Sequence, residues 1–384
     1  MLKLILTDFW LQHQASLVVF LAVIIAIAIV NVFALRRFKL GRYQFPKILP
    51  KVSVMVPTRN EEKNIGQCIE SLLAQDYPDF EVIALDDQST DRTWEILQKF
   101  RTVPRLILMQ GKKLPDRWFG KHWACHQMTE AASGEIFLFT DADTKHKPDS
   151  ISSAVAALIA ENADLLTALP REETGSFGEA MLIPVMPFAI LGFLSIPFAH
   201  AVKWPIFSAT VGQFMMFKRK AFEAIGGYPA IKTKQVDDMA FGQRIKKLGY
   251  RWRFFDGQSS VVCRMYGGFK ESFLGLGKTV FSAFGRRIIP FLFVWTFLFT
   301  VFLEPFAVIA VRLSGGPITD LSLLIALSGI LASMLLWTIT ILKFRFPFWT
   351  VFLYPATFAL TLIMAYYSVI ITLSGKATWK GRRL

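Results

Sequence analysis

Apolar residues follow two different patterns along this chain. Near the ends they form long runs that few charges interrupt, whereas from about residue 50 to residue 287 short apolar runs alternate with amphipathic segments. A run of about 20 apolar residues is long enough to cross a bilayer as a helix. The pattern therefore predicts membrane helices on both sides of a folded domain, at residues 16–35, 288–311, 321–342 and 348–373.

The middle region predicts an α/β fold. Short apolar runs are typical of buried strands, and the segments between them place apolar residues such as Ile65, Ile69 and Leu72 at helical spacing. Strands that alternate with helices form a largely parallel sheet covered on both faces. The predicted strands are residues 52–56, 80–85, 105–109, 136–140 and 164–169.

Acidic and polar residues follow the ends of several predicted strands. Asp141 and Asp143 follow the fourth strand, Asp86 and Asp87 follow the second, and a polar turn at residues 57–61 follows the first. Open α/β sheets hold their ligands at this carboxyl edge, and paired carboxylates there suit a hard divalent cation. The alternative for each loop taken alone is a solvated or helix-capping turn.

Together with Asp237-Asp238 further along the chain, these motifs resemble those of the family 2 glycosyltransferases. The resemblance covers roughly residues 51–278. It implies a GT-A fold, which is a Rossmann-like domain that binds nucleotide sugars. It also implies a nucleotide-sugar donor, which we expect to be a UDP-sugar, and Mg²⁺ or Mn²⁺ as the cofactor.

The resemblance assigns a role to each loop. The turn after the first strand would dock the nucleotide base, and a carboxylate after the second strand would accept a hydrogen bond from the uracil imide. The carboxylates after the fourth strand would meet the ribose and the metal, which neutralises the leaving diphosphate as a Lewis acid. The residues expected to bind the donor are Pro57, Thr58, Arg59, Glu61, Asp86, Asp87, Lys121, Asp141, Arg264 and Lys278, and the expected metal ligands are Asp143 and Asp141.

Two further segments supply candidate catalytic groups. The loop at residues 114–123 interleaves aromatic and basic residues around Gly120, so it suits a cover over a sugar nucleotide with Lys121 near the phosphates. Asp237 and Asp238 open an amphipathic helix, where acidic residues ordinarily complement the helix dipole. The family usually has Glu-Asp here with the Asp as general base, so the resemblance assigns that role to Asp238 with Asp237 beside it. The helix start lowers the pKa of Asp238 and Asp237 raises it, and the sequence leaves the balance open.

Two short segments most resemble the bacterial glycosyltransferases associated with carotenoids and hopanoids. They are Trp-Phe-Gly-Lys at residues 118–121 and Arg-Met-Tyr at residues 264–266. Processive polysaccharide synthases and ceramide glucosyltransferases carry a Gln-x-x-Arg-Trp motif instead. The nearest stretch here, residues 275–279, lacks its Gln and Trp and leaves Lys278 to supply the cation. This departure favours the addition of one sugar to one lipid.

Charge predicts the orientation of the folded domain. Arg36, Arg37, Lys39 and Arg42 follow the first apolar run, so the positive-inside rule places the domain in the cytoplasm. The net charge is +14, and because basic residues gather beside the apolar runs, it favours anionic lipid over nucleic acid. Three C-terminal crossings would leave the basic tail outside. Either one of them is re-entrant, or the charge rule fails here.

The apolar segment at residues 181–203 is long enough to span a membrane, but spanning would separate Asp238 from Asp143. We therefore expect an interfacial element that lets an apolar acceptor reach the donor. An unusually apolar core helix is the alternative. The three cysteines are widely scattered, which fits reduced cytosolic thiols.

The expected organisation is an N-terminal anchor at residues 1–45, a cytoplasmic GT-A domain at residues 46–287 and a membrane region of two to three spans with a basic tail at residues 288–384. The expected activity is inverting, metal-dependent transfer of a hexose, glucose from UDP-glucose, to a carotenoid or other polyisoprenoid lipid of the cytoplasmic membrane. The expected partners are a nucleotide sugar, a lipid acceptor and the bilayer, without nucleic acid. The alternatives are a processive polysaccharide synthase and a non-catalytic transporter or scaffold with a degenerate domain.

Overall fold

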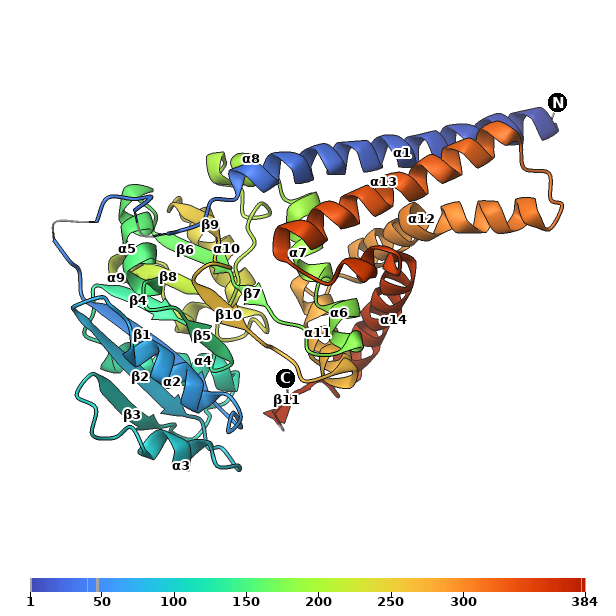
Figure 1. The fold of residues 1–384 in the computed structure, drawn as a ribbon. Coiled ribbons are helices and arrows are strands. Elements are labelled where there is room, and N and C mark those ends of the chain that lie inside the picture. The colour runs from blue at the N-terminus through green and yellow to red at the C-terminus, as the bar shows by residue number, and fades with distance from the viewer. Residues whose placement is uncertain (1, 40, 46–47, 381, 384) are drawn as a thin grey trace. The chain divides into compact units, whose positions relative to one another are not determined.

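The computed structural model of the chain describes residues 2–39, 41–45, 48–380 and 382–383 (Figure 1). The chain divides into two compact units. The helical unit comprises Met1–Ala34, Thr174–Ser195 and Tyr266–Ser374. The α/β unit comprises Leu35–Glu173, Ile196–Met265 and Gly375–Leu384. The chain therefore passes from one unit to the other several times, and each unit is built from segments that are distant in sequence.

The α/β unit contains a seven-stranded sheet with the order β3-β2-β1-β4-β8-β6-β9. Neighbouring strands are parallel except for the two pairs that involve β8. The predicted strands are confirmed, and the sheet is largely parallel as expected. The strands are β1 (Val52–Thr58), β2 (Phe80–Asp86), β3 (Leu106–Gln110), β4 (Ile136–Phe139), β6 (Leu165–Leu169), β8 (Met215–Lys218) and β9 (Trp252–Asp256).

Short helices connect these strands, and a smaller sheet has the order β5-β10-β7. The helices are α2 (Ile65–Leu73), α3 (Thr93–Gln98), α4 (Gly120–Ala131), α5 (Ser150–Ala160), α8 (Ile196–Ala201), α9 (Arg219–Ala224), the 3-10 turn η1 (Tyr228–Ala230) and α10 (Asp237–Lys247). The strands of the small sheet are β5 (Thr144–His146), β7 (Arg171–Glu172) and β10 (Val261–Cys263). Near the C-terminus, β11 (Thr378–Trp379) and β12 (Arg382–Arg383) pair antiparallel.

The core of the α/β unit holds the carboxyl edge of the sheet in place. Val54 from β1, Leu138 from β4, Ile69 from α2 and Val155 from α5 are fully buried members of one hydrophobic cluster. Burial of an aliphatic side chain of this size contributes about 1.5–3 kcal/mol. Packing in this hydrophobic core therefore fixes the positions of the strand ends from which the polar loops extend.

The helical unit contains the long apolar helices. The helices are α1 (Leu2–Ala34), α6 (Phe177–Leu182), α7 (Val185–Phe193), α11 (Phe269–Ala283), α12 (Ile288–Leu313), α13 (Asp320–Phe344), the 3-10 turn η2 (Phe348–Val351) and α14 (Tyr354–Leu373). Among the described residues four helical stretches are long and apolar enough to cross a membrane, namely Trp10–Ala34, α12, α13 and α14. They match the four apolar runs of the sequence.

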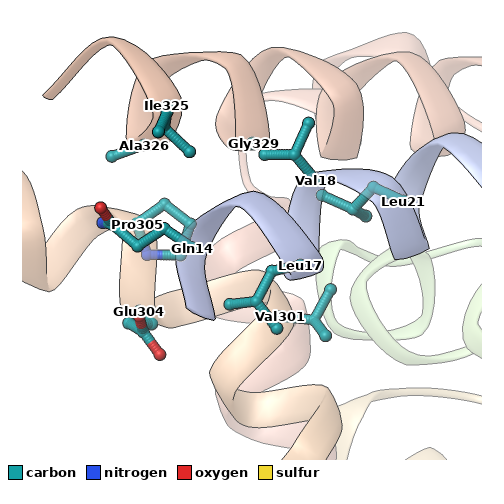
Figure 2. A pocket seen from close by; sticks show the side chains of 10 residues that line it. All are labelled: Gln14, Leu17, Val18, Leu21, Val301, Glu304, Pro305, Ile325, Ala326 and Gly329. Carbon is teal, nitrogen blue, oxygen red and sulfur yellow. The ribbon is translucent and has the colours of Figure 1, made fainter. Parts of the chain in front are cut away.

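Figure 1 shows α13 beside α1, and α12 also packs against α13. Two polar contacts join helices of this unit: His13 Nε2 lies 2.9 Å from Glu304 Oε2, and Asn31 Nδ2 donates to the carbonyl oxygens of Leu191 and Leu194 at 2.8 and 2.7 Å. Figure 2 shows a pocket between α1, α12 and α13 that Glu304 borders. Polar side chains within a membrane-spanning helix are costly unless they face the interior of the bundle. These contacts therefore favour the arrangement of helices that keeps the polar groups inside.

The apolar segment at residues 181–203 does not form one long helix. Pro184 lies at the start of α7, and Leu194 ends it in an extended conformation. The next helix, α8, belongs to the α/β unit, whereas α6 and α7 belong to the helical unit. By themselves α7 and α8 are too short for a crossing, and the apolar helical stretch Phe177–Phe193 formed by α6 and α7 is shorter than the four long helices.

Candidate active site

The candidate site lies at the carboxyl ends of three adjacent parallel strands. In the sheet, β1 lies between β2 and β4. Asp86 is the last residue of β2, and the Asp141-Ala142-Asp143 loop follows β4. Thr58 pairs with Asp86 at the end of β1, so the motifs after separate strands converge at one edge, as expected for ligand binding in an open α/β sheet.

The Asp86-Asp87 pair forms one end of the site and presents two unsatisfied acceptors. The two residues are only 4% and 2% exposed. Oδ2 of Asp86 accepts a hydrogen bond from the backbone N–H of Ser89 at 3.3 Å, but Oδ1 of Asp86 and Oδ1 of Asp87 are buried without a hydrogen-bond partner among the described residues. Buried acceptors without partners are costly. These two oxygens therefore suit the N–H groups of a ligand.

Burial also governs the charge at this end. It raises the pKa of Asp87, although Arg382 and Arg59 nearby act in the opposite direction. The Arg59 guanidinium donates to the carbonyl oxygens of Asp87 and Gln88, the latter at 2.9 Å. Arg59 therefore fixes the loop backbone, while Oδ1 of Asp86 and Oδ1 of Asp87 remain without a partner among the described residues.

The Asp141 and Asp143 carboxylates form the middle of the site. Asp143 Oδ1 accepts from the Cys263 thiol at 3.6 Å, and Asp141 Oδ1 pairs with Lys121 Nζ at 2.6 Å. Burial raises the pKa of Asp143 to about 7, and the carboxylates of Asp141 and Glu61 add to this effect. The raised pKa also reflects several carboxylates that lie close together, and such a cluster suits the binding of a cation.

This donor set fits a Mg²⁺ or Mn²⁺ ion that also binds other ligands. Among the described residues no group of three or more His, Cys, Asp or Glu side chains is arranged to hold a metal. A Mg²⁺ ion is commonly bound by one or two carboxylates and completes its shell with water and phosphate oxygens. Asp143 and Asp141 would hold such an ion only together with the phosphates of a substrate.

Lys121 interacts with carboxylates of both the Asp141-Ala142-Asp143 loop, called the metal loop below, and the start of α10. Burial alone would lower its pKa, but the charges of Asp141 and Asp237 raise the pKa well above its ordinary value. Lys121 therefore remains an ammonium ion inside a carboxylate cluster. It is placed by the first turn of α4, which begins at Gly120.

The Asp237-Asp238 pair opens α10, as the sequence predicted. Asp238 Oδ2 accepts from the backbone N–H of Gly212 at 3.1 Å, and Oδ1 accepts from the N–H of Met239 at 2.6 Å. Burial, followed by the charge of Asp237, raises the pKa of Asp238 to about 7. The structure thereby answers the question that the sequence left open, because burial and the neighbouring acid outweigh the helix start.

The other member of the pair behaves differently. Burial acts to raise the pKa of Asp237, but the charges of Lys121 and His122 and hydrogen bonds from backbone N–H groups outweigh it, so the pKa is lowered. Asp237 therefore stays ionised while Asp238 titrates near neutrality. A pair of acids with separated pKa values is typical of a site that needs one permanent charge and one proton acceptor.

Gly212 marks the point where these groups meet. A Cβ atom at this glycine would lie 3.4 Å from Asp238 Oδ2, 3.4 Å from Lys121 Nζ and 3.8 Å from Asp141 Oδ2. The metal-loop carboxylate, the cation and the carboxylate of Asp238 therefore surround one small volume. This convergence is the geometric centre of the candidate site.

Not all of the remaining predicted residues lie at the carboxylate cluster. Pro57 and Thr58 lie within β1, and the Thr58 hydroxyl donates to Leu85 O at 2.9 Å, so it links two strands. Arg264 is exposed, and its backbone N–H donates to Asp143 O at 3.4 Å. Lys278 belongs to α11 of the helical unit. The α/β unit therefore forms the carboxylate cluster without Lys278.

Sequence reasoning missed several residues around the metal loop. Glu172 is 5% exposed, and burial followed by the charge of Asp143 raises its pKa well above the ordinary value. Gln213 Nε2 donates to Glu172 Oε1 at 3.3 Å. The two-residue strand β7 carries no periodic signal, so nothing in the sequence pointed to Glu172. Lys380 and Arg382 from the C-terminal segment were also missed.

Comparison with known proteins agrees with this geometry. Residues 53–226 match the model of the family described as glycosyl transferase family 2. The probable glycosyltransferase YdaM of Bacillus subtilis is 28% identical over 220 residues, which cover 54% of this chain and 50% of YdaM. The 4,4'-diaponeurosporenoate glycosyltransferase of Staphylococcus aureus is 24% identical over 262 residues, which cover 64% of this chain and 66% of that protein. The chain thus spans about half to two thirds of the length of these relatives.

A solved structure extends the likeness to the fold. The mannosyltransferase PcManGT of Pyrobaculum calidifontis, in complex with GDP-Man and Mn²⁺, superposes with a TM-score of 0.55 at 21% identity, and the match covers 93% of this chain and 98% of that one. The chain therefore has a GT-A fold with additional apolar helices, and its residues 53–226 resemble glycosyl transferase family 2.

Proposed function

We propose that this protein transfers a hexose from a UDP-sugar, glucose from UDP-glucose, to a membrane lipid, with inversion at the anomeric carbon. The observation that carries the proposal is the convergence of Asp141, Lys121 and Asp238 around Gly212. One side of that volume offers carboxylates for a metal-bound diphosphate, and the other offers a carboxylate with a pKa of about 7. A donor and a nucleophile placed between them would react in line.

The donor would lie along the strand ends. The free oxygens Oδ1 of Asp86 and Asp87 would accept from the base, and Asp141 and Asp143 would face the ribose and the metal. A bound Mg²⁺ or Mn²⁺ supplies Lewis-acid neutralisation of the leaving diphosphate. The complex of PcManGT with GDP-Man and Mn²⁺ supports a nucleotide sugar and a metal in general terms. UDP is proposed from the resemblance, so UDP-glucose and GDP-mannose should be compared directly as donors.

Asp238 would act on the acceptor. Its carboxylate takes the proton of the acceptor hydroxyl while the acceptor oxygen forms a bond to C1 of the sugar. The bond between C1 and the phosphate oxygen breaks at the same time, and UDP leaves with that electron pair. Attack from the face opposite the phosphate inverts the anomeric carbon. The backbone N–H of Gly212 orients the Asp238 carboxylate for this step.

A lipid acceptor is proposed from the apolar helices and from one relative. Four stretches of the described chain are long and apolar enough to span a membrane. The relative from Staphylococcus aureus is named for transfer to 4,4'-diaponeurosporenoate. An acceptor of that kind partitions into the bilayer, so an enzyme that uses it gains from being held there. We propose the cytoplasmic membrane, with the α/β unit on the side where nucleotide sugars are made.

The division into units supports a specific number of crossings. The chain leaves the α/β unit at Met265 and returns to it at Gly375, so the helices between these points cross the membrane an even number of times. Within the helical unit α13 packs along α1 and α12, whereas α14 packs on α11 and α12 and more lightly on α6. We therefore propose that α1, α12 and α13 cross and that α14 is interfacial. This arrangement also satisfies the positive-inside rule for the basic tail.

Reporter fusions test this topology. We expect a reporter placed after residue 150 and one placed after residue 384 both to be cytoplasmic, and one in the α12–α13 loop at Gly315 to be external. The reason is that two crossings, and not three, separate the α/β unit from its own C-terminal segment. An external signal from the reporter after residue 384 would contradict the proposed role of α14.

The pH dependence of turnover tests Asp238 as the base. Only the ionised carboxylate accepts a proton, and its pKa is about 7. At saturating metal and donor we expect kcat to fall about tenfold per pH unit below neutrality and to level off above it. Asp238→Asn should remove this dependence and give a flat profile. A wild-type profile that is flat between pH 5.5 and 8 would exclude a base of this pKa.

Purified full-length protein in detergent, with Mn²⁺, labelled UDP-glucose and a membrane lipid extract, tests the activity itself. We expect UDP release and a lipid product heavier by one hexose. Products that lengthen with time would support the processive synthase. Failure to transfer or hydrolyse any nucleotide sugar would support the non-catalytic alternative and contradict the proposal.

A further inference from the structure

The C-terminal segment Gly375–Leu384 belongs to the α/β unit and brings two cations to the candidate site. The Arg382 guanidinium pairs with Oδ2 of Asp87, and the Lys380 ammonium pairs with Glu61. These residues are about 300 positions apart in the sequence, at separations of 295 and 319. The segment therefore reaches both the second-strand loop and the first-strand loop of the site.

Arg382 is held by several contacts at the Asp86-Asp87 end. Besides the ion pair, Nη2 of Arg382 donates to Gln88 Oε1 at 3.0 Å and approaches Asp87 O at 3.4 Å. A Cβ atom at Gly120 would lie 2.7 Å from Arg382 Nη1 and 3.0 Å from Asp87 Oδ2. The glycine at the start of α4 therefore leaves the space that the guanidinium occupies.

Lys380 is held at the loop after β1. Arg59 Nε donates to the backbone carbonyl of Lys380 at 3.1 Å, and Lys380 Nζ donates to Asn60 O at 3.4 Å. Lys380 is thus fixed by a carboxylate and by a backbone carbonyl of the loop after β1.

The tail leaves the unsatisfied acceptors of the site open. Arg382 uses Oδ2 of Asp87, whereas Oδ1 of Asp87 and Oδ1 of Asp86 lack a partner in the described part of the chain. Ion pairs join carboxylates of the site to Lys121, Lys380 and Arg382, and the last two come from the tail. An acidic site that must take up an anionic diphosphate needs such cations.

We propose that Lys380 and Arg382 are part of the donor-binding site, in which Lys380 binds the diphosphate and Arg382 fixes the Asp87 carboxylate for the base. The inference rests on the proposed function, because it concerns the same nucleotide. Lys380 is a binding residue and Arg382 is a positioning residue. If these residues instead filled the site and blocked the donor, their removal would increase the affinity for the nucleotide.

Nucleotide binding to the full chain in detergent with Mn²⁺ separates these possibilities. The variants are Lys380→Ala, Arg382→Ala, the double variant, and Lys376→Ala as the matched control, an exposed cation of the same segment. We expect the double variant to raise the Kd for UDP about tenfold or more and Lys376→Ala to change it less than twofold. In turnover, KM for the UDP-sugar should rise while kcat stays within about threefold.

The use of uridine as a second probe separates the two roles. Lys380→Ala should weaken UDP and leave uridine unaffected, whereas Arg382→Ala should weaken both, since Asp87 faces the base in either ligand. As a control for folding, the midpoint of thermal unfolding is measured for each variant. We expect it to equal that of the wild-type protein. An unchanged Kd for UDP in the double variant overturns the proposal, and a lower Kd overturns it in favour of a blocking tail. If the wild-type chain binds no nucleoside diphosphate at all, the proposed function fails together with it.

Discussion

Asp238→Asn lowers kcat for transfer to a hydroxyl acceptor by about 10²–10⁴-fold, the range typical of a lost general base. The amide has the same size and keeps an oxygen for the N–H of Gly212, but its NH2 group cannot accept from the N–H of Met239. The amide also cannot accept the proton of the acceptor. Because the donor would be held by the loops after β1, β2 and β4, the Kd for UDP-glucose should change little.

A control and an acceptor comparison sharpen this result. Asp320→Asn removes an exposed acid from the first turn of α13 in the helical unit and should leave turnover unchanged. A carboxylate acceptor arrives already ionised and needs no base, so Asp238→Asn should affect its transfer far less. Equal losses with hydroxyl and carboxylate acceptors, or loss of donor binding, would give Asp238 a different role.

Asp143→Asn removes most of the metal-supported activity, and a chelator does the same to the unaltered protein. Loss of a group that only orients a metal ligand commonly costs 10–100-fold in metal affinity or activity, so we expect loss of the ligand itself to cost at least as much. Asp143 is the buried carboxylate whose pKa rises to about 7 beside Asp141 and Glu61, so a bound cation would return it to the ionised state. The affinity for Mn²⁺ in the presence of UDP can be measured by electron paramagnetic resonance. We expect this affinity to decrease in the Asp143→Asn variant together with turnover.

The matched control for this variant is Asp164→Asn, which changes an acid that pairs with Lys218 away from the carboxylate cluster. It should preserve both Mn²⁺ binding and turnover. Full activity of the wild-type protein in excess EDTA would contradict the assignment of a metal to this loop, whatever the behaviour of the variants.

Much of the fold was accessible from the sequence because local patterns determine it. The runs that form β1, β2 and β4 are apolar and end in polar loops, so both the strands and the edge that collects their loops were predictable. The antiparallel direction of β8 was not, because Met215–Lys218 has the same composition as a parallel strand. Strands of two or three residues such as β7 carry no pattern at all.

The site was predictable to the extent that its residues follow strands or start helices. Asp86, Asp141 and Asp238 were found in this way. The balance of pKa values within the Asp237-Asp238 pair was not, since it depends on burial that only the folded chain defines. Arg382 was missed for another reason: its partner Asp87 lies 295 positions away in the sequence. In addition, attraction to anionic lipid beside the apolar helices already accounts for the basic C-terminal residues at the level of the sequence.

The anomeric configuration of the lipid product is the most direct measurement of the central claim. The full-length protein would be incubated with UDP-glucose, Mn²⁺ and the lipid fraction that it modifies, and the purified product analysed by mass spectrometry and nuclear magnetic resonance. UDP-glucose is an α-glycoside, so the account predicts a lipid carrying one β-linked glucose, formed by the wild-type protein and nearly absent with Asp238→Asn. An α-linked product, or a β-linked product formed equally well by Asp238→Asn, would contradict it.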